Sequence, residues 1–302
     1  ETVEHRLRRA LGAISEPLEV QGETIRLKAH VGVAMAPEDG AEAEALLTAA
    51  ATALHRAQGG DEPVQFFRPG MQELAKRRLR LEEALKVAIE REELRVWYQP
   101  QVDLDSGHAD AVEALVRWQH PEWGWMSPGE FIPLAEETGQ VGAIGEWVLE
   151  QALAQLVRWH AAGSAITRVC VNMAASQLQQ PQWPATVRRL LERTGAPPAA
   201  LELEVTEEGA LRDIERAVET MGDLKALGVR LAIDDFGTGY SSLAYLKRLP
   251  VDTLKIDKTF VEGLPGIEHD RSITEAILAV SGTLGLGVVA EGVERPEQVD
   301  WL

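Results

Sequence analysis

The later two thirds of the chain alternates short apolar runs with longer amphipathic stretches. Runs of strand length occur at residues 95–101, 110–117, 168–172, 201–205, 229–234, 252–256 and 286–290. Helical patterns lie between most of them, at residues 140–162, 183–194, 211–227, 241–248 and 270–284. Apolar strands separated by helices are typical of a parallel sheet in an α/β fold. The pattern therefore predicts a TIM-like (β/α)8 barrel with one strand unaccounted for.

The first 68 residues follow a different pattern, of a helix, two strands, a helix and a strand. Residues 25–35 alternate apolar and polar positions, residues 41–58 form an alanine- and leucine-rich helical pattern, and residues 64–67 predict a short strand. Residues 71–94 combine dense charge with spaced apolar positions, which predicts an amphipathic helix that joins two units. We therefore divide the chain into a partial α/β segment, a helical linker and a barrel domain, at residues 1–68, 69–93 and 94–302.

The net charge of the chain limits the classes of molecule that it is expected to bind. The 48 acidic and 30 basic residues give a formal net charge of −18, which disfavours nucleic-acid polymers because their binding depends on Lys and Arg. A small anion held through a metal ion remains compatible with this charge. The single cysteine, Cys170, lies in an apolar run and permits no disulfide within the chain, so we expect a buried thiol and a cytoplasmic location.

The chain holds no candidate membrane span. Its apolar runs fall short of the roughly 18 residues that a spanning helix needs. The sequence begins at Glu1 rather than at a methionine, so we expect it to be part of a longer protein. That longer protein could carry a membrane tether elsewhere.

Polar side chains recur at or near the ends of the predicted strands. They are Glu113, Asn172, Glu204, Asp234, Asp235, Lys255 and Glu291. Because the active sites of barrels lie at the carboxyl ends of the strands, we expect these side chains to converge. Five carboxylates, an amide and a lysine are costly to bury together without a counter-charge. Oxygen ligands of this kind suit Mg²⁺ or Mn²⁺.

Each of these residues, taken alone, has an ordinary structural explanation. A single glutamate at a strand end is often solvated, Asp234-Asp235 before a glycine could form a turn, and Lys255 could reach solvent from a buried stem. The joint occurrence on successive strands favours a site. Three tryptophans could stack on a nucleobase, although packing in the core or at its rim is more usual: Trp118, Trp123 and Trp125.

An ordered series of motifs links these residues to a known family. The motifs are Tyr98-Gln-Pro100, Glu113-Ala-Leu-Val-Arg-Trp118, Phe131-Ile-Pro-Leu-Ala-Glu-Glu-Thr-Gly139, Val171-Asn172, Leu201-Glu-Leu-Glu-Val-Thr-Glu207, Asp234-Asp-Phe-Gly-Thr-Gly-Tyr-Ser-Ser242, Leu254-Lys-Ile-Asp257 and Val289-Ala-Glu-Gly-Val-Glu294. From about residue 72 to residue 302 the chain resembles the EAL domain, a phosphodiesterase that hydrolyses the bacterial messenger cyclic di-GMP. The resemblance implies a TIM-like barrel and hydrolysis to linear pGpG with two Mg²⁺ or Mn²⁺ ions.

The resemblance also implies a role for each site residue. Glu113, Asn172, Glu204 and Asp234 match metal ligands, and Asp234 would bridge to a second ion beside Asp235. The remaining matches concern water, substrate and a loop. Lys255 would hold the attacking water, Glu291 would act as the base or water-positioning acid, and Glu207 would order the loop after Asp235 and take part in homodimerisation; the implied substrate contacts are Gln99, Arg117 and Glu113.

Two other kinds of protein remain open at this point. A catalytically silent receptor would bind cyclic di-GMP without hydrolysing it, but such receptors usually lose metal ligands or the lysine, and all are present here. Another metal-dependent barrel enzyme, such as an enolase-type lyase, would need a different order of motifs. The enzyme is therefore the favoured interpretation.

The two ends of the chain carry further expectations. Residues 31–40 lie in a segment that resembles the C-terminal part of a GGDEF domain, whose signature would lie upstream. Gly59-Gly-Asp-Glu-Pro63 looks like that signature, but it follows a helix instead of lying in a hairpin, so we expect no cyclase activity. The sequence stops before the eighth strand and a late glutamine motif of the EAL domain, so we expect the natural protein to continue past Leu302.

Overall fold

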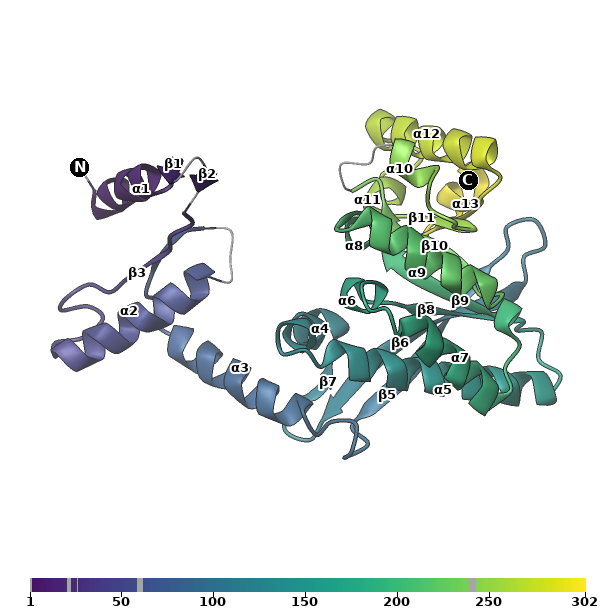
Figure 1. Cartoon of the computed structure of the whole chain (residues 1–302), viewed down its shortest axis with the longest axis horizontal. Helices are drawn as coiled ribbons and strands as arrows, with labels where there is room; N and C mark the ends of the chain where they lie inside the picture. The colour runs from purple at the N-terminus through teal and green to yellow at the C-terminus, as the bar shows by residue number, and fades with distance from the viewer. Residues whose placement is uncertain (1, 21–22, 26, 59–61, 239–242) are drawn as a thin grey trace. The chain divides into compact units, whose positions relative to one another are not determined.

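The computed structural model divides the chain into two compact units, Glu1–Ala84 and Leu85–Leu302 (Figure 1). It describes residues 2–20, 23–25, 27–58, 62–238 and 243–302. Each unit is described here by itself. The division at residues 84 and 85 falls within the predicted linker, and the domain boundaries at residues 68 and 93 stay predictions.

The first unit is a small α/β segment in which one helix lies close against two parallel strands. Its elements are α1 (Val3–Ile14), β1 (Leu18–Val20), β2 (Glu23–Ile25), β3 (Val31–Val33), α2 (Ala43–Gln58), β4 (Val64–Phe66) and α3 (Met71–Leu85). Strands β1 and β2 form an antiparallel pair, whereas β3 and β4 are parallel. A Cβ atom at Gly32 would lie 2.1 Å from the carbonyl oxygen of Ala50, so only glycine permits this approach of α2.

Of two predictions for the N-terminal part of the chain, the structure corrects the linker helix and leaves the GGDEF resemblance untested. The helix predicted over residues 71–94 is wrong beyond Leu85, where α3 ends. Turns follow α3, and Glu92 takes a left-handed φ of 54°. Leu94 is then buried as the first residue of strand β5 in the second unit, which a helix continued to residue 94 would not allow. The misplaced signature at Gly59–Pro63 falls partly outside the described residues, and the GGDEF resemblance stays a prediction.

The second unit is a curled sheet of the TIM type, with helices between its strands (Figure 1). Seven strands follow one another in the order β12-β11-β10-β9-β8-β6-β5, and β7 pairs with β6. The strands are β5 (Leu94–Val102), β6 (Ala109–His120), β7 (Gly124–Met126), β8 (Arg168–Asn172), β9 (Leu201–Thr206), β10 (Arg230–Phe236), β11 (Thr253–Ile256) and β12 (Gly287–Ala290). All seven strands that the sequence predicts are therefore present.

The first strand of this sheet departs from the expected parallel arrangement. Strand β5 runs antiparallel to β6, whereas β6, β8, β9, β10, β11 and β12 are parallel in succession. The connection at residues 103–108 is too short for a helical crossover, and the amide of Asp103 donates to the carbonyl of His108 across a hairpin loop. The missing helical pattern between residues 101 and 110 was the signal for this hairpin.

The helices of the second unit include counterparts of the five predicted helical stretches and further helices, such as Pro128–Glu137, that the sequence did not predict. They are α4 (Pro128–Glu137), α5 (Val141–Ala161), α6 (Ala175–Leu178), α7 (Trp183–Thr194), α8 (Glu207–Leu211), α9 (Ile214–Ala226), α10 (Leu243–Leu246), α11 (Lys258–Val261), α12 (Glu268–Leu284) and α13 (Pro296–Trp301). The helix predicted at 211–227 corresponds to α9, which begins later, at Ile214, because Asp213 accepts a hydrogen bond from the amide of Arg216 and caps it; Leu211 ends the separate helix α8. Of the helix predicted at 241–248, the first two residues lie outside the described ranges.

Alternation along β9 separates two environments. Leu201, Leu203 and Val205 are buried, as expected for the face that the helices cover, whereas Glu202 and Glu204 share the opposite face, inside the curled sheet. Two groups of polar residues result, each with a buried centre and partly exposed members. We call them the lower layer (Arg168, Cys170, Glu202, Arg230 and Thr253) and the upper layer (Glu113, Asn172, Glu204, Asp234, Asp235, Lys255 and Glu291).

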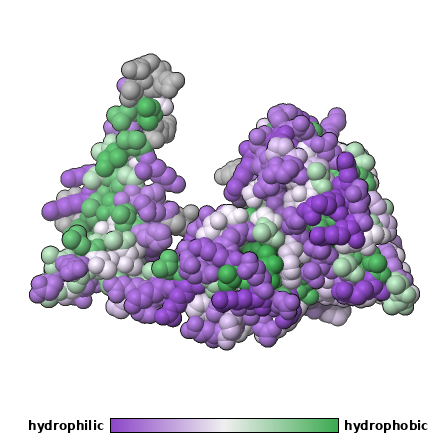
Figure 2. All heavy atoms as spheres, turned by 60° about the horizontal axis from the view of Figure 1, so that its bottom comes forward, coloured by the Kyte–Doolittle hydropathy of each residue, from purple (hydrophilic) through white to green (hydrophobic). Residues whose placement is uncertain are grey.

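The face of the molecule that Figure 2 shows is mostly polar. In Figure 2, hydrophilic residues cover most of the visible surface and apolar residues form smaller patches between them. None of the helices in the described part of the chain is long and apolar enough to cross a membrane.

Candidate active site

Strand register brings the upper layer together at the carboxyl ends of the strands. Asn172, the last residue of β8, is paired with Glu204 of β9, and Glu113 of β6 is paired with Cys170, two residues before Asn172. The side-chain amide of Asn172 donates to Oε1 of Glu113 over 2.7 Å. Three predicted ligands from three neighbouring strands therefore face one region.

Lys255 is the centre of the upper layer. Its side chain is fully buried, and its Nζ lies within salt-bridge distance of four carboxylates. The distances are 2.7 Å to Glu204 Oε2, 2.7 Å to Glu291 Oε1, 3.1 Å to Asp234 Oδ1 and 3.3 Å to Glu113 Oε2. One ammonium group thus faces more negative charge than it can neutralise.

The electrostatics of the layer follow from burial and from this imbalance. Burial by itself lowers the pKa of Lys255, but the surrounding carboxylates outweigh it and hold the pKa above its ordinary value. Burial raises the pKa of Glu204 to about 8, and the charges of Glu113 and Asp234 add to that rise against the opposing effect of Lys255. Burial likewise raises the pKa of Glu291. The carboxylates of this layer therefore lack sufficient positive charge.

A bulge in β10 turns two consecutive aspartates toward the same region. The pairing of β10 with β11 shifts between Ile233 and Phe236, and Asp235 has a left-handed φ of 53°. Successive residues of a regular strand point to opposite faces, so the bulge is what lets Asp234 and Asp235 act together. Their carboxylate oxygens lie within 4.8 Å of each other and of Glu291. A left-handed conformation at a non-glycine residue costs about 1–3 kcal/mol and is often found at functional sites.

The donor set of the upper layer fits a hard divalent cation. Oε1 of Glu204 is buried and has no hydrogen-bond partner in the described part of the chain, which is unfavourable unless a cation faces it. Carboxylate and amide oxygens are the ligands that Mg²⁺ and Mn²⁺ prefer. Five residues could supply them: Glu113, Asn172, Glu204, Asp234 and Asp235.

Glu207 lies outside the carboxylates that surround Lys255. It is the first residue of α8, it is buried, and its Oε2 accepts a hydrogen bond of 3.0 Å from the amide of Gly237. Gly237 follows Asp235 by two residues, and the described residues of this segment end at Thr238. Glu207 therefore contacts the segment that the sequence assigned to it.

Gln99 and Arg117 flank the upper layer on β5 and β6. Gln99 is exposed and paired with Glu113, and Arg117 is two alternations further along β6 from Glu113, so the three share one face. Nη1 of Arg117 donates to the carbonyl of Val116 over 2.8 Å. Both predicted substrate contacts are beside the site rather than within it.

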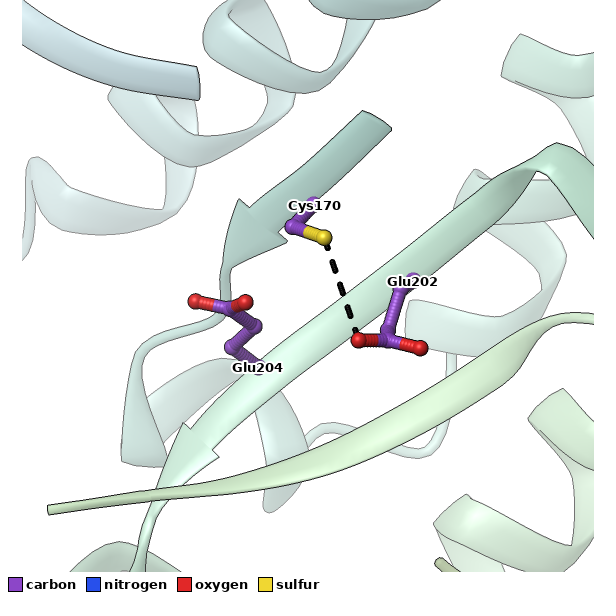
Figure 3. A group of neighbouring side chains, drawn as sticks. All are labelled: Cys170, Glu202 and Glu204. Carbon is purple, nitrogen blue, oxygen red and sulfur yellow. Dashed lines mark hydrogen bonds between the residues drawn. The ribbon is translucent and has the colours of Figure 1, made fainter. Parts of the chain in front are cut away.

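The lower layer holds a balanced buried carboxylate. Nε of Arg230 lies 2.9 Å and Nε of Arg168 lies 3.9 Å from Oε2 of Glu202. The hydroxyl of Thr253 and the thiol of Cys170 also donate to Glu202, the latter as drawn in Figure 3. Cys170 is buried as predicted, and burial raises the pKa of its thiol, so it stays protonated. This layer is a structural network rather than a second metal site.

Several contacts were not assigned from the sequence. Asp257 was noted only as part of a motif, but its charge raises the pKa of Asp235 after the larger effects of burial and of Asp234. Trp118 is fully buried against Phe131, with ring centroids 5.6 Å apart, and Trp123 stacks on His120 at 4.0 Å. Trp125 is exposed and contacts Trp97, which the sequence gave no reason to single out.

Comparison with known proteins establishes the family. The model of the EAL domain matches residues 82–302, and the chain belongs to this family. It is 42% identical over 295 residues to the cyclic di-GMP phosphodiesterase NbdA of Pseudomonas aeruginosa, covering 97% of this chain and 38% of that protein. It is also 42% identical over 290 residues to the bifunctional diguanylate cyclase/cyclic di-GMP phosphodiesterase MucR of the same organism, covering 96% and 42%. The chain thus spans about two fifths of these relatives.

A solved structure agrees with this placement. The PaMucR phosphodiesterase in its complex with c-di-GMP is similar with a TM-score of 0.71 and 45% sequence identity, covering 74% of this chain and 90% of that one. The EAL domain of Mycobacterium smegmatis DcpA is similar with a TM-score of 0.56 and 36% identity, covering 68% and 82%. The predicted EAL resemblance and the TIM-like fold are confirmed.

Proposed function

We propose that this chain hydrolyses cyclic di-GMP to linear pGpG. The observation that carries the proposal is the convergence of four carboxylates on Lys255, with an unpaired buried oxygen on Glu204. Family membership and the names of two relatives, both described as cyclic di-GMP phosphodiesterases, support the choice of substrate. An enolase-type reaction has no such support.

Divalent cations belong to the proposed site. Glu113, Asn172, Glu204, Asp234 and Asp235 would hold two ions, Mg²⁺ or Mn²⁺. When bound, these ions supply the positive charge that neutralises a phosphodiester and lowers the pKa of a water molecule. The excess of carboxylates over cations in the upper layer supports this assignment.

Lys255 and Glu291 would bind and activate the attacking water. The ammonium of Lys255 can donate a hydrogen bond to the water oxygen, and Glu291 can accept its proton. The side chain of Glu291 is 28% exposed, the most of the four carboxylates around Lys255, so water can reach it. Attack on phosphorus would displace the ribose 3′-oxygen and open the cyclic dinucleotide.

Gln99, Arg117 and Glu113 would contact the substrate on the face of β5 and β6. The planar guanidinium of Arg117 matches the geometry of a phosphate. Glu207 would keep the loop after Asp235 in place through its hydrogen bond to Gly237. Homodimerisation of the EAL domain, a cytoplasmic location and a GGDEF-like origin of residues 1–68 are further parts of this proposal.

The test is incubation of the purified chain with cyclic di-GMP and Mg²⁺ or Mn²⁺, with products separated by chromatography. Linear pGpG that forms only with the divalent ion is the expected result. A catalytically silent receptor would bind cyclic di-GMP and form no pGpG. That outcome would contradict the proposed hydrolysis and would favour a receptor that binds cyclic di-GMP.

A further inference from the structure

Two exposed tryptophans lie next to each other on β5 and β7. Trp97 and Trp125 expose 52% and 51% of their surface, and their ring centroids are 5.4 Å apart in an edge-to-face arrangement. Trp118, by contrast, is fully buried against Phe131 in the core. The two exposed rings therefore contribute little to the core, and their large apolar surface is left available to a ligand.

Strand register places these rings on the face that carries Glu113. In β5, Gln99 is paired with Glu113 and Trp97 with Leu115 of β6. Trp125 of β7 is paired with Gln119, a further alternation along β6. Paired residues and every second residue of a strand share a face, so Trp97 is a diagonal neighbour of Glu113.

The opposite face of β5 is already covered. Tyr98 stacks edge to face on Trp159 of α5, with ring centroids 4.8 Å apart, and its hydroxyl donates to the carbonyl of Gln151. Trp97 must therefore point away from α5 and toward the side of the upper layer. This leaves an open aromatic surface beside the site.

The guanidinium group of Arg117 lies next to this aromatic surface. The Cζ atom of Arg117 lies 5.4 Å from the centroid of the Trp97 ring, within the range of a cation–π contact. A guanidinium group suits a phosphate, and a flat indole suits the face of a nucleobase. The two groups together match a nucleotide whose phosphate lies nearer to the carboxylate site than its base.

We propose that Trp97 stacks on one guanine base of the bound cyclic dinucleotide, while Trp125 supports the indole ring edge-on. This inference rests on the proposed function and adds a substrate-binding residue to it. Because stacking acts on the base and not on the reacting phosphorus, it strengthens substrate binding and leaves the chemical step almost unchanged.

The experiment measures binding separately from turnover. A phosphorothioate analogue of cyclic di-GMP, which resists hydrolysis, is titrated calorimetrically into wild type, Trp97→Ala, Trp97→Phe and Val102→Ala with Mg²⁺ present. Val102 is the matched control because it lies on the same strand and is 56% exposed. Stacking contributes about 1–3 kcal/mol per base, which converts to a rise in Kd of about fivefold to 150-fold for Trp97→Ala. Trp97→Phe is expected to retain most of the affinity, and Val102→Ala all of it.

Steady-state kinetics with cyclic di-GMP gives the second measurement. Trp97→Ala should raise KM by a similar factor and change kcat by less than about threefold. Wild type that binds and hydrolyses while Trp97→Ala binds within twofold of it would overturn the stacking role and leave the proposed function standing. Wild type that neither binds nor hydrolyses would overturn both. A changed sedimentation coefficient with unchanged affinity would assign Trp97 to contact with a second copy and overturn the proposal.

Discussion

The two polar layers of the second unit lie two residues apart on β8, β9 and β11, yet their charge balance differs. In the lower layer, Glu202 faces two guanidinium groups and accepts from Thr253 and Cys170. In the upper layer, four carboxylates converge on Lys255, and among the residues that the structure describes Oε1 of Glu204 has no hydrogen-bond partner. A balanced layer stabilises the fold, whereas an unbalanced layer is a site that needs a cation from outside the chain.

The position of each layer along the strands explains why the charge imbalance occurs in the upper layer. The lower layer lies within the sheet, where Glu202 of β9 forms ion pairs with Arg168 of β8 and Arg230 of β10, the two neighbouring strands. The upper layer lies at the carboxyl ends, where a bulge and a left-handed Asp235 add a further carboxylate. Burial of unpaired charge is tolerated there because ligands can enter from the loops.

The largest expected difference between the layers is catalytic. Asp234→Asn removes the charge of a proposed metal ligand from the upper layer and should lower kcat for cyclic di-GMP at saturating Mg²⁺ by about a thousandfold or more, or about 4 kcal/mol. Formation of pGpG measures the loss, and circular dichroism checks the fold. Near-normal turnover in Asp234→Asn would remove this residue from the metal site.

Replacement of the central cation should give the next largest effect, on stability. Lys255→Met leaves four carboxylates without a positive partner and should lower the free energy of unfolding in metal-free buffer by about 3 kcal/mol. Denaturant titration with and without Mg²⁺ measures it, and added Mg²⁺ should recover part of the loss. Lys258→Met, at an exposed position on α11, is the control. If Lys255→Met is as stable as wild type in EDTA, the excess of carboxylates in the upper layer does not destabilise the fold and this argument is wrong.

The lower layer should respond in stability and not in catalysis. Glu202→Gln removes the counter-charge of two arginines, which are partly exposed, so we expect a loss of about 2 kcal/mol in the free energy of unfolding. Turnover of cyclic di-GMP by the folded variant should stay within about twofold of wild type. A loss of activity as large as that of Asp234→Asn would mean that the two layers act as one site.

The smallest effect is expected at Cys170. Cys170→Ala removes a weak donor and a small buried volume, which should lower the free energy of unfolding by about 1 kcal/mol and leave turnover unchanged. Because burial raises the pKa of the thiol, native protein should also resist alkylation by iodoacetamide at neutral pH. Rapid alkylation, or loss of Mg²⁺-dependent activity in Cys170→Ala, would show that the thiol belongs to the upper layer.

The periodicity of the sequence was sufficient for the strands and for the members of the upper layer. Short apolar runs with polar ends predicted all seven strands, because burial on one or both faces leaves a pattern along the chain. Glu113, Asn172, Glu204 and Lys255 could be recognised for the same reason: charged and amide groups are unusual in such runs. The EAL motifs then assigned each residue a role.

Other features depended on contacts between distant residues. The antiparallel β5, the bulge that turns Asp235, the pairing of Glu202 with Arg168 and Arg230, and the contact of Trp97 with Trp125 all arise from register between strands. A one-residue change in register would reverse which face each side chain occupies without changing the sequence. The sequence by itself therefore determined which residue types were available to the site, and only the tertiary structure decided which charges meet, which are balanced and which need a metal ion.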